Sequence, residues 1–189
     1  MRSVVGVTMI EMSLTLFVLA IVLTLGMPST ALWVHQWQIR ANAESLRSAL
    51  QKSRAEAIAR NTKINITLGD AAGIPQWRIG CVRLSAICPG NLQVQVASAG
   101  DSLRWGAASA ADAANLSVAL VVGAGLPGQV EFHPLGDAPR ITSGSDIARI
   151  DVLHPNDSLA GRRVVRIDGA GNVSICDPSL PASDTRGCH

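Results

Sequence analysis

The strongest constraint on the fold of this chain is an apolar run near its N-terminus. Between Val7 and Val34 the sequence holds a single charged residue, Glu11. A helix needs about 20 apolar residues to cross the hydrocarbon core of a bilayer, and this run is longer. The remainder of the chain, after Val34, alternates between polar and apolar residues and carries nearly all of the charge. The sequence therefore predicts one membrane-spanning helix followed by one water-soluble domain.

A cleaved secretory signal is the alternative explanation for this run. Such a signal has about 7–15 apolar residues followed by a small-residue cleavage site of the A-x-A type. Here the run is too long and no such site comes after it, so the anchor is expected to be retained. Arg2 precedes the run, and the positive-inside rule then predicts a single-pass inner-membrane protein with its C-terminal domain in the periplasm.

The residues around the start of the run resemble the class III signal of type IV prepilins and pseudopilins. Gly6-Val7-Thr8-Met9-Ile10-Glu11 carries the resemblance, together with the short basic leader before it. The resemblance implies that a prepilin peptidase removes residues 1–6 by cutting after Gly6, and that Val7 becomes the methylated N-terminus. Val7 departs from the Phe or Met that the family prefers. Pro28 falls where many pilins carry a helix-bending proline.

The same resemblance implies an assembly role for Glu11, which falls on the fifth mature residue of the family. A carboxylate in lipid costs about 2.5–3.5 kcal/mol at mid-membrane on insertion scales, and less near an edge. Once the leader is removed, the α-ammonium of Val7 lies one helical turn from Glu11 and offsets this cost. In the family this glutamate registers each incoming subunit. The alternative is a carboxylate that is merely tolerated at the membrane edge.

A helical pattern continues beyond the apolar run. Six residues recur at spacings of three and four and define one face, namely Ile39, Ala43, Leu46, Leu50, Ser53 and Ala57. This pattern predicts one helix from Val7 to about Arg60, with a bend near Gly26 and Pro28. Residues 7–34 would lie in lipid or in a filament core, and residues 35–60 would pack on a β-rich head of residues 61–189.

Strand patterns dominate the rest of the chain. The predicted strands are 63–68, 76–84, 92–96, 116–122, 129–132, 147–153, 163–167 and 172–176, with a hairpin joining the last two. The low-complexity stretch 107–114 is predicted to be a loop or a short helical turn. A long N-terminal helix followed by antiparallel strands indicates an α+β fold.

This half of the chain resembles the H-type pseudopilins and the FimT/FimU minor pilins. SALQKSRAEAIARN, VEFHPLGDAPRI and RRVVRIDGAGNVSIC carry the resemblance. It implies a type IV pilin-like fold, with the helix packed on two small antiparallel sheets, and other minor and major (pseudo)pilins as partners. Pro28-Ser29 and the helix after them favour type IV pilus minor pilins over secretion pseudopilins.

The cysteines fit a periplasmic head. The chain has four, Cys81, Cys88, Cys176 and Cys188, and an even number in an oxidising compartment favours disulfides. Three pairings are open, of which the short loops 81–88 and 176–188 are the simplest. Zinc is the rival, but there is no C-x-x-C and no paired histidine, so no metal is expected.

The sequence carries no local signature of catalysis or of a cofactor. The glycines of 123–128 spell GxGxxG, but Pro127 and a strand-like stretch come next, whereas a dinucleotide site needs a helix there. The four histidines are scattered, and there is no G-x-S-x-G. We therefore expect no cofactor and no enzymatic activity, with a membrane-tethered enzyme whose site is assembled from distant residues as the remote alternative.

One basic cluster leaves a DNA-binding role open. Arg162, Arg163 and Arg166 form it, with Arg140 and Arg149 as further candidates nearby. Arginine clusters bind phosphate backbones, and the FimT-like branch is linked to DNA uptake through a G-R-x-R motif. The best-aligned stretch, 171–174, lacks both arginines, and the net charge is only +2.

The favoured hypothesis is thus a minor (pseudo)pilin of a type IV pilus or a type II secretion pseudopilus, which is processed by the prepilin peptidase and methylase and is assembled into a filament or primes one. A DNA-binding minor pilin for natural transformation is the alternative, and DNA is not the favoured partner.

Overall fold

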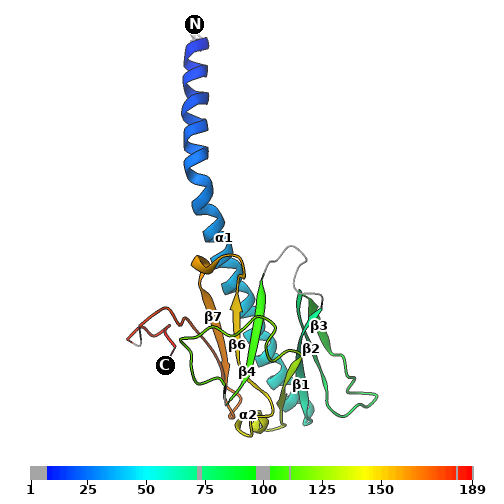
Figure 1. Ribbon diagram of the computed structural model, residues 1–189. Helices are drawn as coiled ribbons and strands as arrows, with labels where there is room; N and C mark the ends of the chain where they lie inside the picture. The colour runs from blue at the N-terminus through cyan, green and yellow to red at the C-terminus, as the bar shows by residue number, and fades with distance from the viewer. Residues whose placement is uncertain (1–7, 72–73, 97–102, 111, 182, 189) are drawn as a thin grey trace.

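A 52-residue helix, α1 (Met9–Arg60), runs through the whole molecule (Figure 1). The computed structural model describes residues 8–71, 74–96, 103–110, 112–181 and 183–188. At about 1.5 Å per residue, α1 is about 78 Å long. Its N-terminal half projects from the head, and its C-terminal half lies against the β-strands. Asn61, in the left-handed conformation with φ of 48°, ends the helix.

The C-terminal half of α1 buries the face that its spacing predicts. All six residues of that face are buried: Ile39, Ala43, Leu46, Leu50, Ser53 and Ala57. The one polar member, Ser53, donates its hydroxyl to the carbonyl oxygen of Ala49 at 2.9 Å, so this buried polar group has a partner. Contact with the head begins before residue 35, because Leu32 already packs against the core.

The strands form two antiparallel sheets of four strands each. The first has the order β3-β2-β1-β5, made of β1 (Ile64–Ala71), β2 (Ile74–Cys81), β3 (Gln93–Val96) and β5 (Gly128–Phe132). The second has the order β4-β6-β7-β8, made of β4 (Arg104–Ser109), β6 (Ile147–Leu153), β7 (Arg162–Ile167) and β8 (Val173–Cys176). Two short helical segments, α2 (Pro139–Thr142) and η1 (Ser158–Ala160), flank β6. The α+β class predicted from sequence, a long N-terminal helix with two small antiparallel sheets, is therefore correct.

The core lies between α1 and both sheets. In β1 the apolar side chains of Ile64, Ile66 and Leu68 are fully buried, while the residues between them are partly exposed. In β6, Ala148, Ile150 and Val152 face the same core. The two sheets thus share one helix as their common cover, as the resemblance to the minor pilins implies.

Two sequence predictions in the middle of the chain are wrong. Residues 116–122 form turns and irregular backbone instead of a strand, and Val118 and Val121 are exposed. Conversely, residues 107–109 of the low-complexity stretch belong to β4. The backbone of Gly125 approaches this strand closely, because a Cβ on Gly125 would lie 2.2 Å from the carbonyl oxygen of Ala107. The segment 112–127 lies over the second sheet. This tertiary contact explains why 116–122 is not a strand and why 107–109 is one.

Candidate functional site

The predicted assembly site lies at the N-terminal end of α1. Gly6 and Val7 are outside the described residues. Glu11 lies in the first turn of the helix, whose first backbone bonds run from the N–H groups of Glu11 and Met12 to the carbonyl oxygen of Thr8. The N-terminus of a helix carries partial positive charge, so a carboxylate is favoured in this turn.

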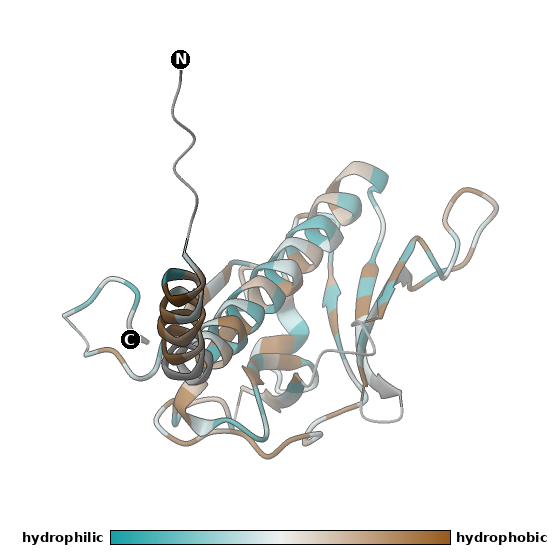
Figure 2. Ribbon diagram, turned by 90° about the horizontal axis from the view of Figure 1, so that it is seen from above, coloured by the Kyte–Doolittle hydropathy of each residue, from teal (hydrophilic) through white to brown (hydrophobic). Residues whose placement is uncertain are grey.

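Apolar side chains surround Glu11 on all sides of the helix. In the isolated chain Met9 is 91% exposed and Phe17 is 66% exposed. In Figure 2 the ribbon of this N-terminal half is coloured mostly as hydrophobic, and Figure 1 shows that it projects from the head. Among the described residues, no helix reaches the combined length and apolarity needed for a membrane crossing.

Pro28 lies within α1, and the backbone is helical on both sides of it. In Figure 2 the N-terminal half is viewed nearly end-on while the C-terminal half runs obliquely, so the two halves differ in direction. A proline removes one helical hydrogen bond and is a common cause of such a change. The role of Pro28 as the bend stays a prediction.

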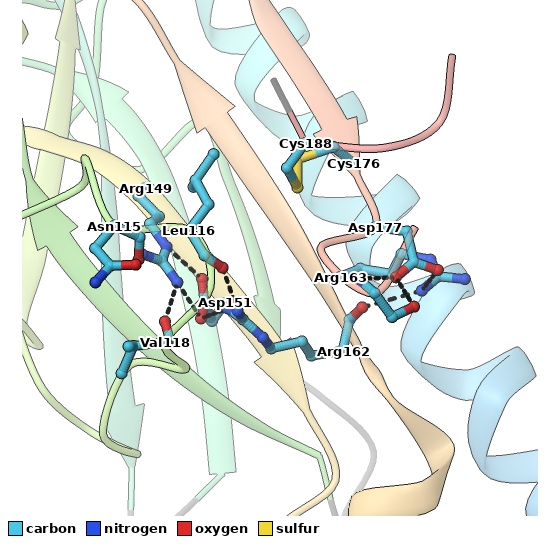
Figure 3. Close-up of a disulfide and its surroundings, with 11 residues drawn as sticks. Asn115, Leu116, Val118, Arg149, Asp151, Arg162, Arg163, Cys176, Asp177 and Cys188 are labelled. Carbon is cyan, nitrogen blue, oxygen red and sulfur yellow. Dashed lines mark hydrogen bonds and ion pairs between the residues drawn. A yellow bond between two sulfur atoms is a disulfide. The ribbon is translucent and has the colours of Figure 1, made fainter. Parts of the chain in front are cut away.

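The structure separates the predicted arginine cluster. Figure 3 shows Arg162 on one side of β7 and Arg163 on the side that faces α1. Arg162 bonds to the buried carboxylate of Asp151, and Arg163 bonds to Asp177 at 2.6 Å. Arg166 is exposed on the same strand. Because two of the three guanidinium groups are held by carboxylates of the chain itself, the three do not form one track for a phosphate backbone.

Arg162 belongs to a buried ionic network instead. Arg149, only 1% exposed, donates through Nε and Nη2 to the two carboxylate oxygens of Asp151 at 2.7 and 2.8 Å. The backbone N–H of Leu120 donates to the same carboxylate at 3.0 Å. Three carbonyl oxygens of the segment 112–127 accept from the two arginines, those of Asn115, Leu116 and Val118. Backbone groups of residues 115–120 therefore bond to side chains of the network, where a strand would bond to a neighbouring strand.

The other basic candidate, Arg140, pairs with the buried carboxylate of Asp146 at 2.9 Å. Asp146 also accepts a bond from the backbone N–H of Glu131 at 2.7 Å, which ties α2 and the following loop to β5. The ion pair with Asp146 raises the pKa of Arg140. Arg140 and Arg149 thus serve the fold of the head rather than a shared basic surface with Arg162.

Both short-loop disulfides are formed. Cys81 pairs with Cys88 and Cys176 with Cys188, at Cα–Cα distances of 5.7 and 4.9 Å. The first closes a loop between β2 and β3, and the second ties the C-terminal segment back to the end of β8 (Figure 3).

The disulfide pairing predicts the thiol content of the protein. Under denaturing, non-reducing conditions the full chain is expected to show no reactive thiol, and four after reduction. Closing loops of this length stabilises by about 2–3 kcal/mol on the chain-entropy model, so reduction should lower the thermal midpoint. Reactive thiols before reduction, or stoichiometric zinc, would contradict the pairing.

The structure brings together two histidines that the sequence leaves scattered. The rings of His35 on α1 and His154 after β6 stack with centroids 4.1 Å apart. His35 Nδ1 lies 2.7 Å from a carboxylate oxygen of Asp157, which also caps η1. Burial, then the neighbouring His35, and last Arg104 lower the pKa of His154, against the opposing effect of Asp157. No local spacing reveals this cluster, because 119 positions separate the two histidines in the numbering.

The His35–His154 contact predicts a pH dependence of stability. Because the pKa of His154 is lower in the folded chain than in the unfolded one, the unfolded chain binds more protons as the pH falls below about 6.5. Stability should therefore decrease between pH 7 and pH 5, and His154→Gln should reduce that slope in thermal unfolding. His133→Gln is the matched control, since His133 lies elsewhere, beside Glu131. An unchanged slope in His154→Gln would contradict the assignment.

The arrangement agrees with one protein family. Residues 42–171, more than half of the chain, match the family described as type II transport protein GspH. The chain belongs to the GspH family. Among solved structures, the type IV minor pilin FimU of Pseudomonas aeruginosa PAO1 superposes with a TM-score of 0.52 at 18% identity, covering 80% of this chain and 98% of that one. A second crystal form of FimU gives 0.48 at 20% identity, covering 76% and 98%.

These likenesses fix the class of the protein. The FimU superposition extends the shared fold over most of the chain. No curated protein matches the chain significantly. The family match makes the chain a GspH-type protein of type II transport, and the likeness to FimU shows that it has the fold of a type IV minor pilin. The sequence-based prediction of a minor (pseudo)pilin is confirmed at that level.

Proposed function

We propose that this GspH-family chain is made as a prepilin, cut after Gly6, N-methylated at Val7 and anchored in the inner membrane by residues 7–34. Its head then lies in the periplasm until the subunit enters a type IV pilus or a type II secretion pseudopilus. The partners in this sequence of events are the prepilin peptidase and methylase, membrane lipid, and other minor and major (pseudo)pilins.

The observation that carries the proposal is the contrast between the two halves of α1. The C-terminal half buries one complete face under the head, whereas residues 9–22 of the N-terminal half expose apolar side chains in every direction. Apolar surface of that extent is unfavourable in water, at roughly 25 cal/mol per Å². It is satisfied in lipid and equally in the core of a helical filament, so one helix suits both stages.

The test is the N-terminus of the mature protein. Mass spectrometry of the chain expressed with its cognate peptidase should show residue Val7 first, carrying one added methyl group. Gly6→Leu should block cleavage and keep the protein in the inner membrane, because a bulky side chain does not fit where the enzyme accepts glycine. Ser3→Leu, a similar increase in size within the same leader, should be cut normally. An intact leader on subunits isolated from filaments would contradict the proposal.

A further inference from the structure

A cleft of about 400 Å³ separates the C-terminal half of α1 from the C-terminal segment of the chain. We call it the arginine cleft. Four arginines line it, Arg40 and Arg47 from α1, Arg163 from β7 and Arg186 from the C-terminal segment. The other lining residues are Glu44, Ile175, Cys176, Asp177 and Leu180. None of these residues belongs to the predicted assembly site around Glu11.

The four guanidinium groups outnumber the carboxylates that line the cleft. Only Glu44 and Asp177 are carboxylates among the lining residues. Asp177 is held by Arg163 at 2.6 Å, and Glu44 lies 3.7 Å from Arg47, which is a loose contact. Arg186 pairs with Asp184 just outside the lining. The cleft therefore keeps excess positive charge.

Two further observations show that this positive charge is incompletely satisfied. The Nε of Arg47 is buried and has no hydrogen-bond partner within the described part of the chain. The pKa of Arg163 is lowered, first by burial and then by the positive charges of Arg40 and Arg186, although Asp177 opposes this. An anion in the cleft would relieve the repulsion among these arginines.

The disulfide of the C-terminal segment builds one wall of the cleft. The Cys176–Cys188 bond closes the loop that carries Leu180 and Arg186 opposite α1. Figure 3 shows Arg163 and Asp177 between that disulfide and the helix. Because the loop is covalently tied at both ends, its arginine lines the same cleft as the helical ones, although its side chain is 77% exposed.

We propose that the arginine cleft receives an acidic peptide segment of a neighbouring filament subunit, whose Asp or Glu carboxylates pair with Arg40, Arg47 and Arg186. The inference rests on the proposed function for the identity of the partner. Arginine forks match carboxylates in two-point geometry. The apolar walls, Ile175 and Leu180, suit the methylene groups and backbone of a peptide.

The shape and position of the cleft favour a peptide over the other sources of negative charge. The two carboxylates in the wall, Glu44 and Asp177, oppose the continuous charge of a nucleic acid. A lipid surface is also disfavoured, because the cleft lies well beyond the apolar N-terminal half of α1. The helix rises about 1.5 Å per residue. Arg40 and Arg47 on α1 therefore lie about 8–18 Å further from the N-terminal half than His35. At the level of His35, η1 already covers the helix.

The test is a titration of the full-length protein in detergent with fluorescently labelled hexaglutamate, at low and at physiological salt. Arg40→Gln/Arg186→Gln removes two charges from the mouth of the cleft and should weaken binding about tenfold or more. Arg78→Gln/Arg83→Gln is the matched control. It makes the same charge change at exposed positions in β2 and in the loop after it. Cys176→Ser/Cys188→Ser should also weaken binding, because the wall opens.

Equal affinity in the wild type and the cleft variant, or an equal loss in the control variant, would overturn the proposal. A parallel titration with an oligothymidylate and with inorganic phosphate separates the sources. If either binds more tightly than hexaglutamate and is lost in the same cleft variant, the cleft is a phosphate site and the peptide partner is wrong. None of these results alters the N-terminal residue of the mature chain, so failure here is distinguishable from failure of the proposed function.

Discussion

Replacing Asp151 by Asn is expected to lower the free energy of unfolding by about 3–5 kcal/mol, since removal of one charged partner leaves a buried charge uncompensated. Asp151 is fully buried, and it accepts bonds from Arg149, Arg162 and the backbone N–H of Leu120. Of these two arginines, Arg149 is too deeply buried to reach water. Chemical denaturation of the full chain in detergent measures the loss.

Glu56→Gln is the control for this prediction. Glu56 forms a partly exposed pair with Arg60 at 2.6 Å, one helical turn away. Such pairs contribute about 0.3–0.5 kcal/mol, so the control should barely shift the midpoint. In Asp151→Asn the segment 112–127 should also become the first site of proteolysis, because Arg149 and Arg162, which hold its carbonyl groups, lose the carboxylate that positions them. A loss below that of the control would show that the network does not anchor the segment.

Changing Glu11 to Ala is expected to leave cleavage and methylation intact and to reduce incorporation into filaments about tenfold or more, the equivalent of about 1.4 kcal/mol. The physical reason is the missing carboxylate partner for the Val7 ammonium in a low-dielectric core, where a charge pair is stronger than in water. Quantification of the subunit in sheared filaments, against the amount in the membrane, measures the effect.

Glu56→Ala serves as the comparison on the same helix. It removes a carboxylate from the part of α1 that lies on the head, outside the apolar half. This variant should assemble as the wild type does. Normal incorporation of Glu11→Ala would return Glu11 to the role of a carboxylate tolerated at the membrane edge.

Periodic patterns predicted most of the regular structure. The buried face of α1 and the alternation in β1 are read directly from side-chain spacing, because helices and strands repeat at fixed intervals. The short-loop cysteine pairs also form as the spacing favoured. The pattern failed at 116–122, where apolar residues alternate but the backbone bonds to Arg149, Asp151 and Arg162 rather than to a strand.

The candidate sites divide in the same way. Glu11 can be recognised from its immediate sequence neighbours, because a lone carboxylate in an apolar run is unusual. The arginine cleft is not marked, since Arg40 and Arg186 are brought together only when the C-terminal segment is tied beside α1. The cluster at 162–166 is dense in the sequence but divided in the structure, because neighbours on a strand point to opposite faces and find different partners.

The sequence by itself thus determined the long helix, its apolar and packed halves, most of the strands and the family resemblance, because each depends on contacts or periodicities within one segment. Only the tertiary structure decided which partners the charged side chains have and how deeply they are buried. A guanidinium group becomes an anchor at Arg149, a helix-facing partner of Asp177 at Arg163, or part of an open cleft at Arg40. Burial and the nearest carboxylate make that choice, and both depend on segments far apart in the chain.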